Sequence, residues 1–250
     1  MTPEIIAHRG ASADAPENTL AAIQLAWQYG ADAAEIDVML TADGQLVTIH
    51  DETTLRTGGV DWVVKDRTLA ELKTLDVGSW KSPQFADERI PTLAEVLEIV
   101  PNGKRLLIEV KCGIDAIPEL VRVLSTAKTA SDQTVLISFD FDLIVAVKRA
   151  LPDRLAFWVV EQFASGNIES PLEPATDELI QRTLAARLDG LDINDLVERP
   201  SGDVAAIRQA GLGTCIWTVN SLDRARWLRD EGMLSITTDV PAKLLAGLKD

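Results

Sequence analysis

The sequence lacks several features that mark common classes of protein. Only Cys112 and Cys215 of its 250 residues are cysteines, and their wide separation argues against a disulfide framework and predicts reduced thiols. The net charge is −15 and no basic block occurs, which argues against nucleic acid or an anionic membrane surface as a partner. No apolar run is long enough to span a bilayer, and the first residues lack the basic and apolar regions of a signal peptide. We therefore expect a cytoplasmic protein without stable membrane insertion, whose oligomeric state the sequence leaves open.

Two further absences narrow the chemistry. No GxGxxG or Walker loop is present, so the usual Gly-rich cradles for nucleotide phosphates are missing. Histidine occurs only twice, as His8 and His50, and each ends an apolar run where a strand would meet a loop. Imidazole can give and take protons near neutral pH because its unperturbed pKa is about 6.5. The placement of both residues indicates catalysis, with a buried histidine that satisfies a backbone group as the alternative.

Apolar runs of strand length alternate with helix-like segments along the chain. The expected strands are Ile5–His8, Ala34–Leu40, Gln45–His50, Arg105–Val110, Thr134–Ser138, Leu155–Val160, Gly190–Ile193, Gly213–Val219 and Ser235–Thr238. The expected helices outside residues 51–104 are Asn18–Tyr29, Asp115–Lys128, Asp142–Ala150, Thr176–Leu188, Asp203–Gln209, Leu222–Glu231 and Pro241–Leu248. About eight βα units without a linker predict a TIM (β/α)8 barrel, as a single catalytic domain over residues 1–250. A doubly wound open sheet is the alternative.

Residues 51–104 interrupt this alternation after the second strand and its hairpin-like extension. We interpret them as a small insertion subdomain with short helices at Leu69–Leu75 and Thr92–Val100. Two interpretations of its large aromatic residues remain open, a core for the insertion or a lid over the site: Trp62, Trp80 and Phe85.

Carboxylates interrupt two of the apolar strands. Glu35 and Asp37 are two residues apart, as are Glu109 and Lys111, so the members of each pair point to one face of their strand. Buried carboxylates are costly unless a cation compensates them, and hard divalent cations such as Mg²⁺ and Ca²⁺ prefer carboxylate oxygens. In (β/α)8 barrels the active site lies at the C-terminal ends of the strands. We expect the three carboxylates to converge there on a metal, with plain salt bridges as the alternative.

Cationic and aromatic side chains fall at the same strand ends. Arg9 follows His8, and Lys111 either contacts an anionic substrate or neutralises the carboxylates. His50 would supply a second imidazole, so that one histidine could act as the general acid and the other as the general base. Trp217 lies either in the core or in a ligand wall. Three carboxylates, two imidazoles and two cations together predict a metal-assisted site for an anionic, phosphate-like substrate.

The site residues belong to a set of short motifs: Ala7-His8-Arg9-Gly10, Pro16-Glu17-Asn18-Thr19, Glu35-Ile36-Asp37, His50-Asp51, Ile108-Glu109-Val110-Lys111, Ser138-Phe139, Trp217-Thr218-Val219-Asn220 and Thr238-Asp239-Val240-Pro241. In these motifs the chain resembles the glycerophosphodiester phosphodiesterases of the bacterial cytoplasmic type. The resemblance runs from residue 5 to about residue 245. It implies a TIM barrel with a small insertion after the second strand. It also implies hydrolysis of a small-molecule glycerophosphodiester to sn-glycerol 3-phosphate and an alcohol.

The resemblance also implies roles for individual residues. Three carboxylates would bind a divalent metal, Mg²⁺ or Ca²⁺: Glu35, Asp37 and Glu109. Two histidines would act as general acid and base: His8 and His50. Arg9 and Lys111 would contact the phosphate, and Trp217 would line the substrate side. Glu17 would orient Arg9 or His8 rather than bind the metal.

Several alternatives stay open on sequence alone. The attacking oxygen belongs either to water or to a glycerol hydroxyl, which would give a cyclic phosphate, and either histidine could be the acid. A cyclising phosphodiesterase and a lysophospholipase D-like enzyme are rivals on the same barrel. A barrel that binds a phosphodiester without turnover is a rival of another class. The two histidines argue against it, since a binding module needs no proton donor or acceptor.

Overall fold

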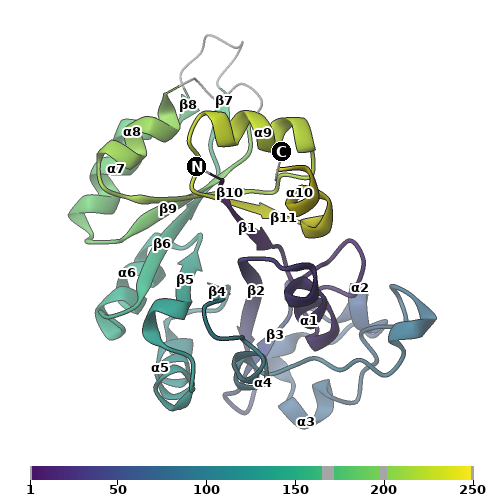
Figure 1. Ribbon diagram of the computed structural model, residues 1–250. Helices are drawn as coiled ribbons and strands as arrows, with labels where there is room; N and C mark the ends of the chain where they lie inside the picture. Colours follow the sequence, from purple (N-terminus) through teal and green to yellow (C-terminus); the bar gives the residue numbers. More distant parts are fainter. Residues whose placement is uncertain (1, 165–171, 197–201, 249–250) are drawn as a thin grey trace.

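The computed structural model describes residues 2–164, 172–196 and 202–248, which form a closed barrel (Figure 1). Its eight parallel strands are β1 (Glu4–Ala7), β2 (Ala33–Leu40), β4 (Arg105–Val110), β5 (Thr134–Ser138), β6 (Leu155–Val160), β9 (Gly190–Asn194), β10 (Gly213–Trp217) and β11 (Ser235–Thr238). Around the ring they follow the order β1-β11-β10-β9-β6-β5-β4-β2. The ring closes where Ile6 and Ala7 of β1 pair with Ala33 and Ala34 of β2. The predicted (β/α)8 barrel is thereby confirmed, and the open-sheet alternative is wrong.

Helices cover the outside of the strands (Figure 1). They are α1 (Leu20–Tyr29), α4 (Leu93–Glu98), α5 (Ile117–Thr126), α6 (Phe141–Ala150), α7 (Thr176–Ala185), α8 (Asp203–Gln209), α9 (Leu222–Asp230) and α10 (Pro241–Gly247). Thr19 caps α1 by accepting a hydrogen bond from the Ala22 N–H, and Gly30 ends the helix in the left-handed conformation. The helix therefore begins two residues later than the predicted Asn18, whose side chain has another function.

Alternation along each strand separates two apolar layers. In β4, Leu106 and Ile108 face the helices, whereas Leu107 faces the barrel interior. Phe157 belongs to the interior cluster and lies beside Gly190 and Gly213, the first residues of β9 and β10. A Cβ atom at Gly213 would lie 2.5 Å from the Phe157 ring, so only glycine leaves room for that ring. Apolar packing thus fills this layer of the barrel, whereas Arg105 and Ser235 both donate hydrogen bonds to Glu4 at the N-terminal ends of their strands.

The segment between β2 and β4 carries its own apolar cluster beside the barrel. It contains β3 (Leu46–Thr48), α2 (Leu55–Gly58), α3 (Leu69–Leu72) and the 3-10 helices η1 (Val64–Asp66) and η2 (Pro83–Phe85). β3 runs antiparallel to β2, and Val64, Leu72 and Ile90 pack with Met39 and Val47. Trp62 packs against this cluster, whereas Trp80 is 43% exposed.

Several elements differ in extent from the sequence prediction. α3 and α4 are shorter than expected, and capping boxes at Thr68 and Thr92 fix where each begins. The sequence did not predict α2, nor the 3-10 helices η3 (Ile114–Ala116) and η4 (Ser131–Gln133). It also missed the hairpin of β7 (Phe163–Ala164) and β8 (Leu172–Glu173). All these elements are only two to four residues long, too short for a periodic pattern.

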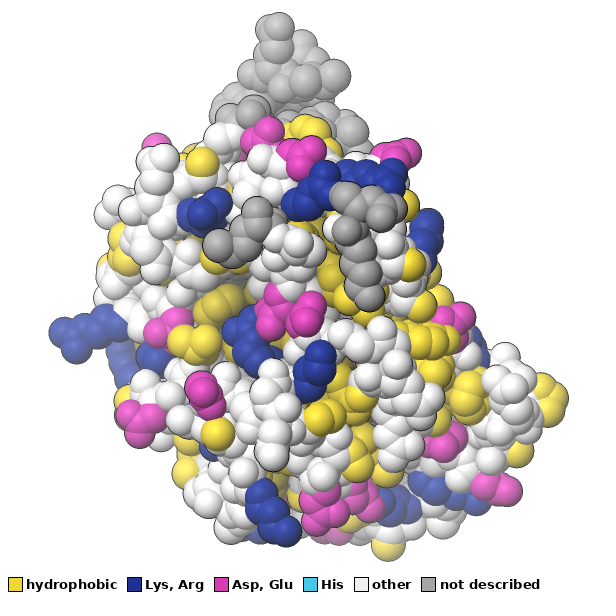
Figure 2. Space-filling model, viewed as in Figure 1, with side chains coloured by type: hydrophobic (Ala, Val, Ile, Leu, Met, Phe, Trp, Pro, Cys, Tyr) yellow, Lys and Arg dark blue, Asp and Glu magenta, His cyan; other side chains and the backbone are white. Residues whose placement is uncertain are grey.

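Surface features agree with the composition. Figure 2 shows Lys and Arg side chains scattered among acidic ones on the face drawn, rather than gathered into one block. Among the described residues no helix has the length and apolar character needed to cross a membrane. Cys112 and Cys215 are both free thiols.

Candidate active site

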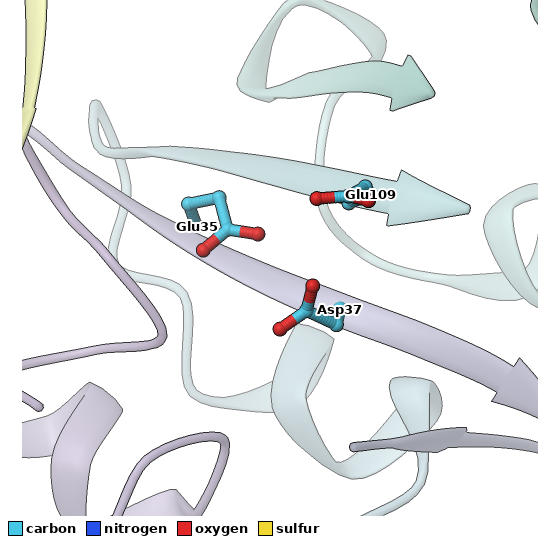
Figure 3. A group of neighbouring side chains, drawn as sticks. All are labelled: Glu35, Asp37 and Glu109. Atoms are coloured by element: carbon cyan, nitrogen blue, oxygen red, sulfur yellow. The ribbon is translucent and has the colours of Figure 1, made fainter. Parts of the chain in front are cut away.

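Three carboxylates from two neighbouring strands, β2 and β4, converge (Figure 3). Glu35 and Asp37 project from β2, and Glu109 projects from β4, where its Cα pairs with that of Asp37. Their nearest ligand oxygens all lie within 4.8 Å of one another. Glu35 and Asp37 are only 3% and 1% exposed, so solvent screens the repulsion between their charges only weakly. The expected convergence of the three side chains is thus observed.

The electrostatics of this cluster call for a cation. Burial, followed by the charges of Asp37 and Glu109, raises the pKa of Glu35 well above its usual value. Burial and the Asp37 charge likewise raise the pKa of Glu109. The Lys111 ammonium lies 3.0 Å from Glu109 and 3.5 Å from Asp37. With Arg9 Nε at 3.3 Å from Asp37, two cations face three carboxylates, which carry one negative charge in excess when all three are ionised. Three oxygen donors with surplus negative charge fit a hard divalent cation.

Arg9 is fixed at the end of β1 by both its backbone and its side chain. Its φ is 55°, and its N–H donates to Glu35 Oε2 at 2.9 Å. Its Nη1 donates to Glu17 Oε1 at 3.0 Å. Of the two orienting contacts that the sequence allowed for Glu17, the structure places it against Arg9. Gly10 has a φ of 81°, and a Cβ there would lie 2.6 Å from the Ala22 carbonyl carbon, so the turn packs directly on α1.

His8 is held by a carboxylate from the last strand end. Its Nδ1 lies 2.7 Å from Asp239 Oδ1. The Ser12 hydroxyl and the Asn220 amide also donate to Asp239, at 3.1 and 2.7 Å. Burial acts to raise the pKa of Asp239, but the hydrogen bond and charge of His8 and the other two donors outweigh it and lower the pKa to about 2. An ionised Asp239 only accepts, so His8 Nδ1 carries the proton and Nε2 is left for chemistry.

His50 has the same kind of partner. Its Nδ1 lies 2.7 Å from Asp51 Oδ1, and Arg56 of α2 donates to both oxygens of that carboxylate at 2.7 and 3.0 Å. The Arg56 hydrogen bond, opposed by burial and supported by His50, lowers the pKa of Asp51 to about 2. Arg56 also donates to both oxygens of Glu17 at 2.7 and 2.8 Å. The Arg56 guanidinium therefore links Asp51, the partner of His50, to Glu17, the partner of Arg9.

Asn18 belongs to a motif of the resemblance and begins a predicted helix, but the sequence assigned it no role in the site. Its amide Nδ2 donates to Asp37 Oδ2 at 2.8 Å, and its Oδ1 accepts the Asp37 N–H at 3.1 Å. Its φ is 57°, a left-handed conformation that asparagine tolerates better than most residues. The Asn18 carbonyl accepts from the Thr48 hydroxyl at 2.7 Å, which anchors the turn to β3. The sequence feature that could have pointed to Asn18 as a site residue is its place next to Glu17 in the Pro16–Thr19 motif.

A pocket of about 160 Å³ lies between the two histidines, the two cations and two of the three carboxylates. It is lined by His8, Arg9, Glu35, His50, Glu109, Lys111, Ile137, Phe139, Val159, Asp192, Trp217, Thr218 and Thr237. The Trp217 and Phe139 rings meet edge to face, with centroids 5.4 Å apart, so Trp217 belongs to the pocket wall. Asp192 of β9 was not among the predicted site residues. Burial, with the charge of Glu109, raises its pKa to about 8.

Comparisons with known proteins agree with this geometry. The model of the Glycerophosphoryl diester phosphodiesterase family matches residues 8–243. The protein YhdW of Bacillus subtilis (strain 168) is 36% identical over 249 residues, which cover 95% of this chain and 94% of YhdW. A glycerophosphodiester phosphodiesterase of the same organism is 31% identical over 254 residues, which cover 94% of this chain and 83% of the relative.

Two solved phosphodiesterase structures have the same fold as this chain. An Oleispira antarctica phosphodiesterase in complex with the product sn-glycerol-3-phosphate superposes with a TM-score of 0.89 at 31% identity, covering 100% of this chain and 98% of that one. A glycerophosphodiester phosphodiesterase from Agrobacterium tumefaciens str. C58 superposes with a TM-score of 0.80 at 28% identity, covering 98% and 99%. The resemblance inferred from the motifs is confirmed by these matches, and the chain belongs to the glycerophosphoryl diester phosphodiesterase family.

Proposed function

We propose that this chain hydrolyses small glycerophosphodiesters to sn-glycerol 3-phosphate and an alcohol, by metal-dependent catalysis with a histidine acid and a histidine base. One observation carries the proposal. Two imidazoles, each with a carboxylate on Nδ1, line a single pocket with Glu35 and Glu109, two of the three carboxylates that converge with Asp37. Family membership and the product bound to the Oleispira antarctica relative support the same reaction class.

Glu35, Asp37 and Glu109 are the residues that would hold the divalent metal, Mg²⁺ or Ca²⁺. When bound, such an ion supplies Lewis-acid stabilisation of negative charge on the phosphate oxygens. The Asn18 side chain donates to the Asp37 carboxylate and accepts from the Asp37 N–H, and these two bonds keep that carboxylate in one orientation.

The two histidines would move the protons. Asp239 and Asp51 each hold one Nδ1–H, which leaves both Nε2 atoms for the substrate. One Nε2 takes a proton from the attacking oxygen, and the other, protonated beforehand, gives a proton to the leaving alkoxide. Positioned acid–base groups of this kind contribute about 10²- to 10⁴-fold each. Water is the attacking group in this proposal, and a glycerol hydroxyl, which would first give a cyclic phosphate, is the alternative.

Arg9 and Lys111 would stabilise the charge that develops on the phosphate. Both line the pocket, and both already face the carboxylates, so their positions are set before substrate arrives. Burial acts to lower the pKa of Lys111, but the charges of Asp37 and Glu109 raise it overall, so the ammonium stays protonated. Lys111 also borders a second hollow of about 520 Å³, which offers space for the alcohol part.

The same proposal covers the setting of the reaction. The whole chain, residues 1–250, would form a single catalytic domain, with residues 51 to about 104 as an insertion that supplies Arg56 to the site. We place the reaction in the cytoplasm, on the ground of the free thiols of Cys112 and Cys215. Nucleic acid is not expected as a partner.

A substrate panel tests the proposal. Glycerophosphocholine, glycerophosphoethanolamine and a lysophospholipid are assayed with Mg²⁺ and with Ca²⁺, and phosphorus NMR identifies the products. We expect glycerol 3-phosphate from the first two substrates, and none from the double variant His8→Ala/His50→Ala purified in parallel. Accumulation of a cyclic phosphate would support the cyclising alternative. Preference for the lysophospholipid would support the lysophospholipase D alternative. Binding without turnover of any substrate would contradict an enzymatic function.

A further inference from the structure

Three side-chain oxygens on neighbouring strands are buried without a hydrogen-bond partner among the described residues. They are Asp192 Oδ1 on β9, Thr214 Oγ1 on β10 and Thr237 Oγ1 on β11. All three residues are at most 3% exposed. A buried polar group without a partner costs free energy, and such groups are retained where a ligand supplies the missing bond. The question is which of the three face a space that a ligand can enter.

Alternation along the strands answers it. Leu191 and Ile193 pack in the outer apolar layer, so Asp192 between them points into the barrel, where it lines the pocket. Thr237 follows the same rule after Ile236 and lines the pocket as well. Thr214 has the opposite orientation, because its neighbour Cys215 belongs to the interior cluster. Thr214 does not border the pocket and therefore serves as an internal control.

Asp192 and the carboxylate cluster lie on opposite walls. Within the ring of eight strands, β9 stands four positions away from β2 in either direction, so it faces Glu35 and Asp37 across the barrel. A phosphodiester whose phosphate lies at the Arg9 and Lys111 side would extend one ester arm toward Asp192. The Asp192 carbonyl also accepts from Trp217 Nε1 at 3.3 Å, so the indole stands beside this arm.

We propose that Asp192 is a specificity-determining residue that binds a hydroxyl group of the polyol arm of the substrate, with Thr237 lining the same pocket. This inference rests on the proposed function. It identifies the part of the substrate that is selected by the pocket wall opposite Glu35 and Asp37. A hydroxyl both donates and accepts, which matches a carboxyl and a threonine hydroxyl that each lack a partner. The raised pKa of Asp192, about 8, leaves the carboxyl mostly protonated at neutral pH, so it does not repel the nearby phosphate.

A competition experiment tests this inference against its nearest rival, a cationic head group bound by an ionised Asp192. Glycerol 3-phosphate and ethyl phosphate, which lacks both hydroxyls, are compared as inhibitors of glycerophosphocholine hydrolysis. In the wild type we expect glycerol 3-phosphate to bind about 10- to 100-fold more tightly, because ethyl phosphate would leave the buried polar atoms of the site without a hydrogen bond. Asp192→Ala should reduce this preference to less than about 3-fold. The variant should also lower kcat/KM for glycerophosphocholine, by about the same factor as the fall in the preference.

Two matched variants separate the explanations. Asp192→Asn keeps hydrogen-bonding capacity and should retain most of the preference, whereas Thr214→Val removes an unpaired buried hydroxyl outside the pocket and should change nothing. Melting temperatures of Asp192→Ala and Asp192→Asn at or above the wild-type value would show that the unpaired carboxyl does not support the fold.

Three outcomes contradict the inference. An unchanged preference in Asp192→Ala means that the residue does not contact the hydroxyls. A loss in Asp192→Asn as large as in Asp192→Ala, seen with glycerophosphocholine but not with an uncharged head group, means that the carboxylate binds a cation. Failure of the wild type to hydrolyse any glycerophosphodiester refutes the proposed function itself, and the inference with it.

Discussion

Replacing Asp239 by asparagine should disable His8 while leaving the site's shape intact. The Oδ2 atom of Asp239 accepts from the Asn220 amide, and its Oδ1 accepts from His8 Nδ1. Asn220 Oδ1 is already engaged by the Thr238 hydroxyl and the backbone N–H of residue 239, so the Asn220 amide keeps its need for an acceptor. The introduced amide oxygen therefore turns to Asn220, and the introduced NH₂ group faces His8. Nδ1 must then accept, which moves the imidazole proton to Nε2, the atom that faces the substrate.

The size of the effect follows from comparable chemistry. The equivalent Asp-to-Asn change in a serine protease triad lowers kcat by about 10⁴-fold through the wrong tautomer. The Asp239 side chain is 34% exposed, so water competes with the bond, and we expect a smaller loss of about 10²-fold, or about 2.7 kcal/mol. The assay is glycerol 3-phosphate release at saturating glycerophosphocholine. Asp189→Asn is the control, because Asp189 is a partly buried carboxylate that bonds to the Ala156 N–H and Lys148 at the opposite end of the barrel.

A double-variant cycle tells whether Asp239 acts through His8. If it does, His8→Ala/Asp239→Asn is no slower than His8→Ala alone. Equal fractional losses in both backgrounds would refute the reasoning, as would a kcat within about 3-fold of the wild type. Acid denaturation gives an independent measurement. Because the folded pKa of Asp239 is lowered to about 2, its stabilisation is present above pH 4 and is lost as the pH falls toward 2. With solvent screening this amounts to about 1 kcal/mol, which Asp239→Asn should remove.

The remaining predictions concern the other parts of the site. His8→Ala and His50→Ala should each lower kcat at least about 100-fold while retaining affinity for glycerol 3-phosphate; wild-type turnover in either variant would exclude that residue from proton transfer. EDTA should abolish activity, and Mg²⁺ or Ca²⁺ should restore it; full activity in chelator would contradict the metal assignment. Asn18→Ala, which frees both bonds to Asp37, should weaken metal binding about 10- to 100-fold with kcat recovered at saturating metal. A calorimetric titration measures that change, and unaltered affinity would mean that Asn18 is merely structural.

Local patterns were sufficient to predict the barrel and much of the site. The pairs Glu35 with Asp37 and Glu109 with Lys111 stand two residues apart, and a strand turns that spacing into a shared face whatever the rest of the chain does. The convergence of the pairs required only that β2 and β4 be neighbours, as a (β/α)8 barrel with one insertion makes them. His8 and Arg9 followed from the same rule, because all parallel strands of a barrel end at one rim.

Other residues depend on contacts that no short pattern encodes. Arg56 lies on a helix of four residues within the insertion, and only the folded insertion brings it to Glu17 and Asp51. Asp192 lies in a strand of ordinary apolar pattern, and the role proposed for it rests on its Oδ1 atom, which has no hydrogen-bond partner among the described residues. A missing contact is a property of the assembled barrel, so no reading of residues 190–194 alone could have shown it.

The Pro16–Thr19 turn shows why neighbouring residues of one motif need separate explanations. Thr19 caps α1, and Asn18 holds Asp37 through two hydrogen bonds. The left-handed conformation of Asn18 allows its side chain to turn toward β2 while the chain continues into the helix. Glu17 contacts Arg9 and Arg56 from the same turn. The start of a helix, a candidate metal ligand and a candidate phosphate clamp are therefore fixed by three consecutive residues, and a change in the turn's backbone would disturb all three together.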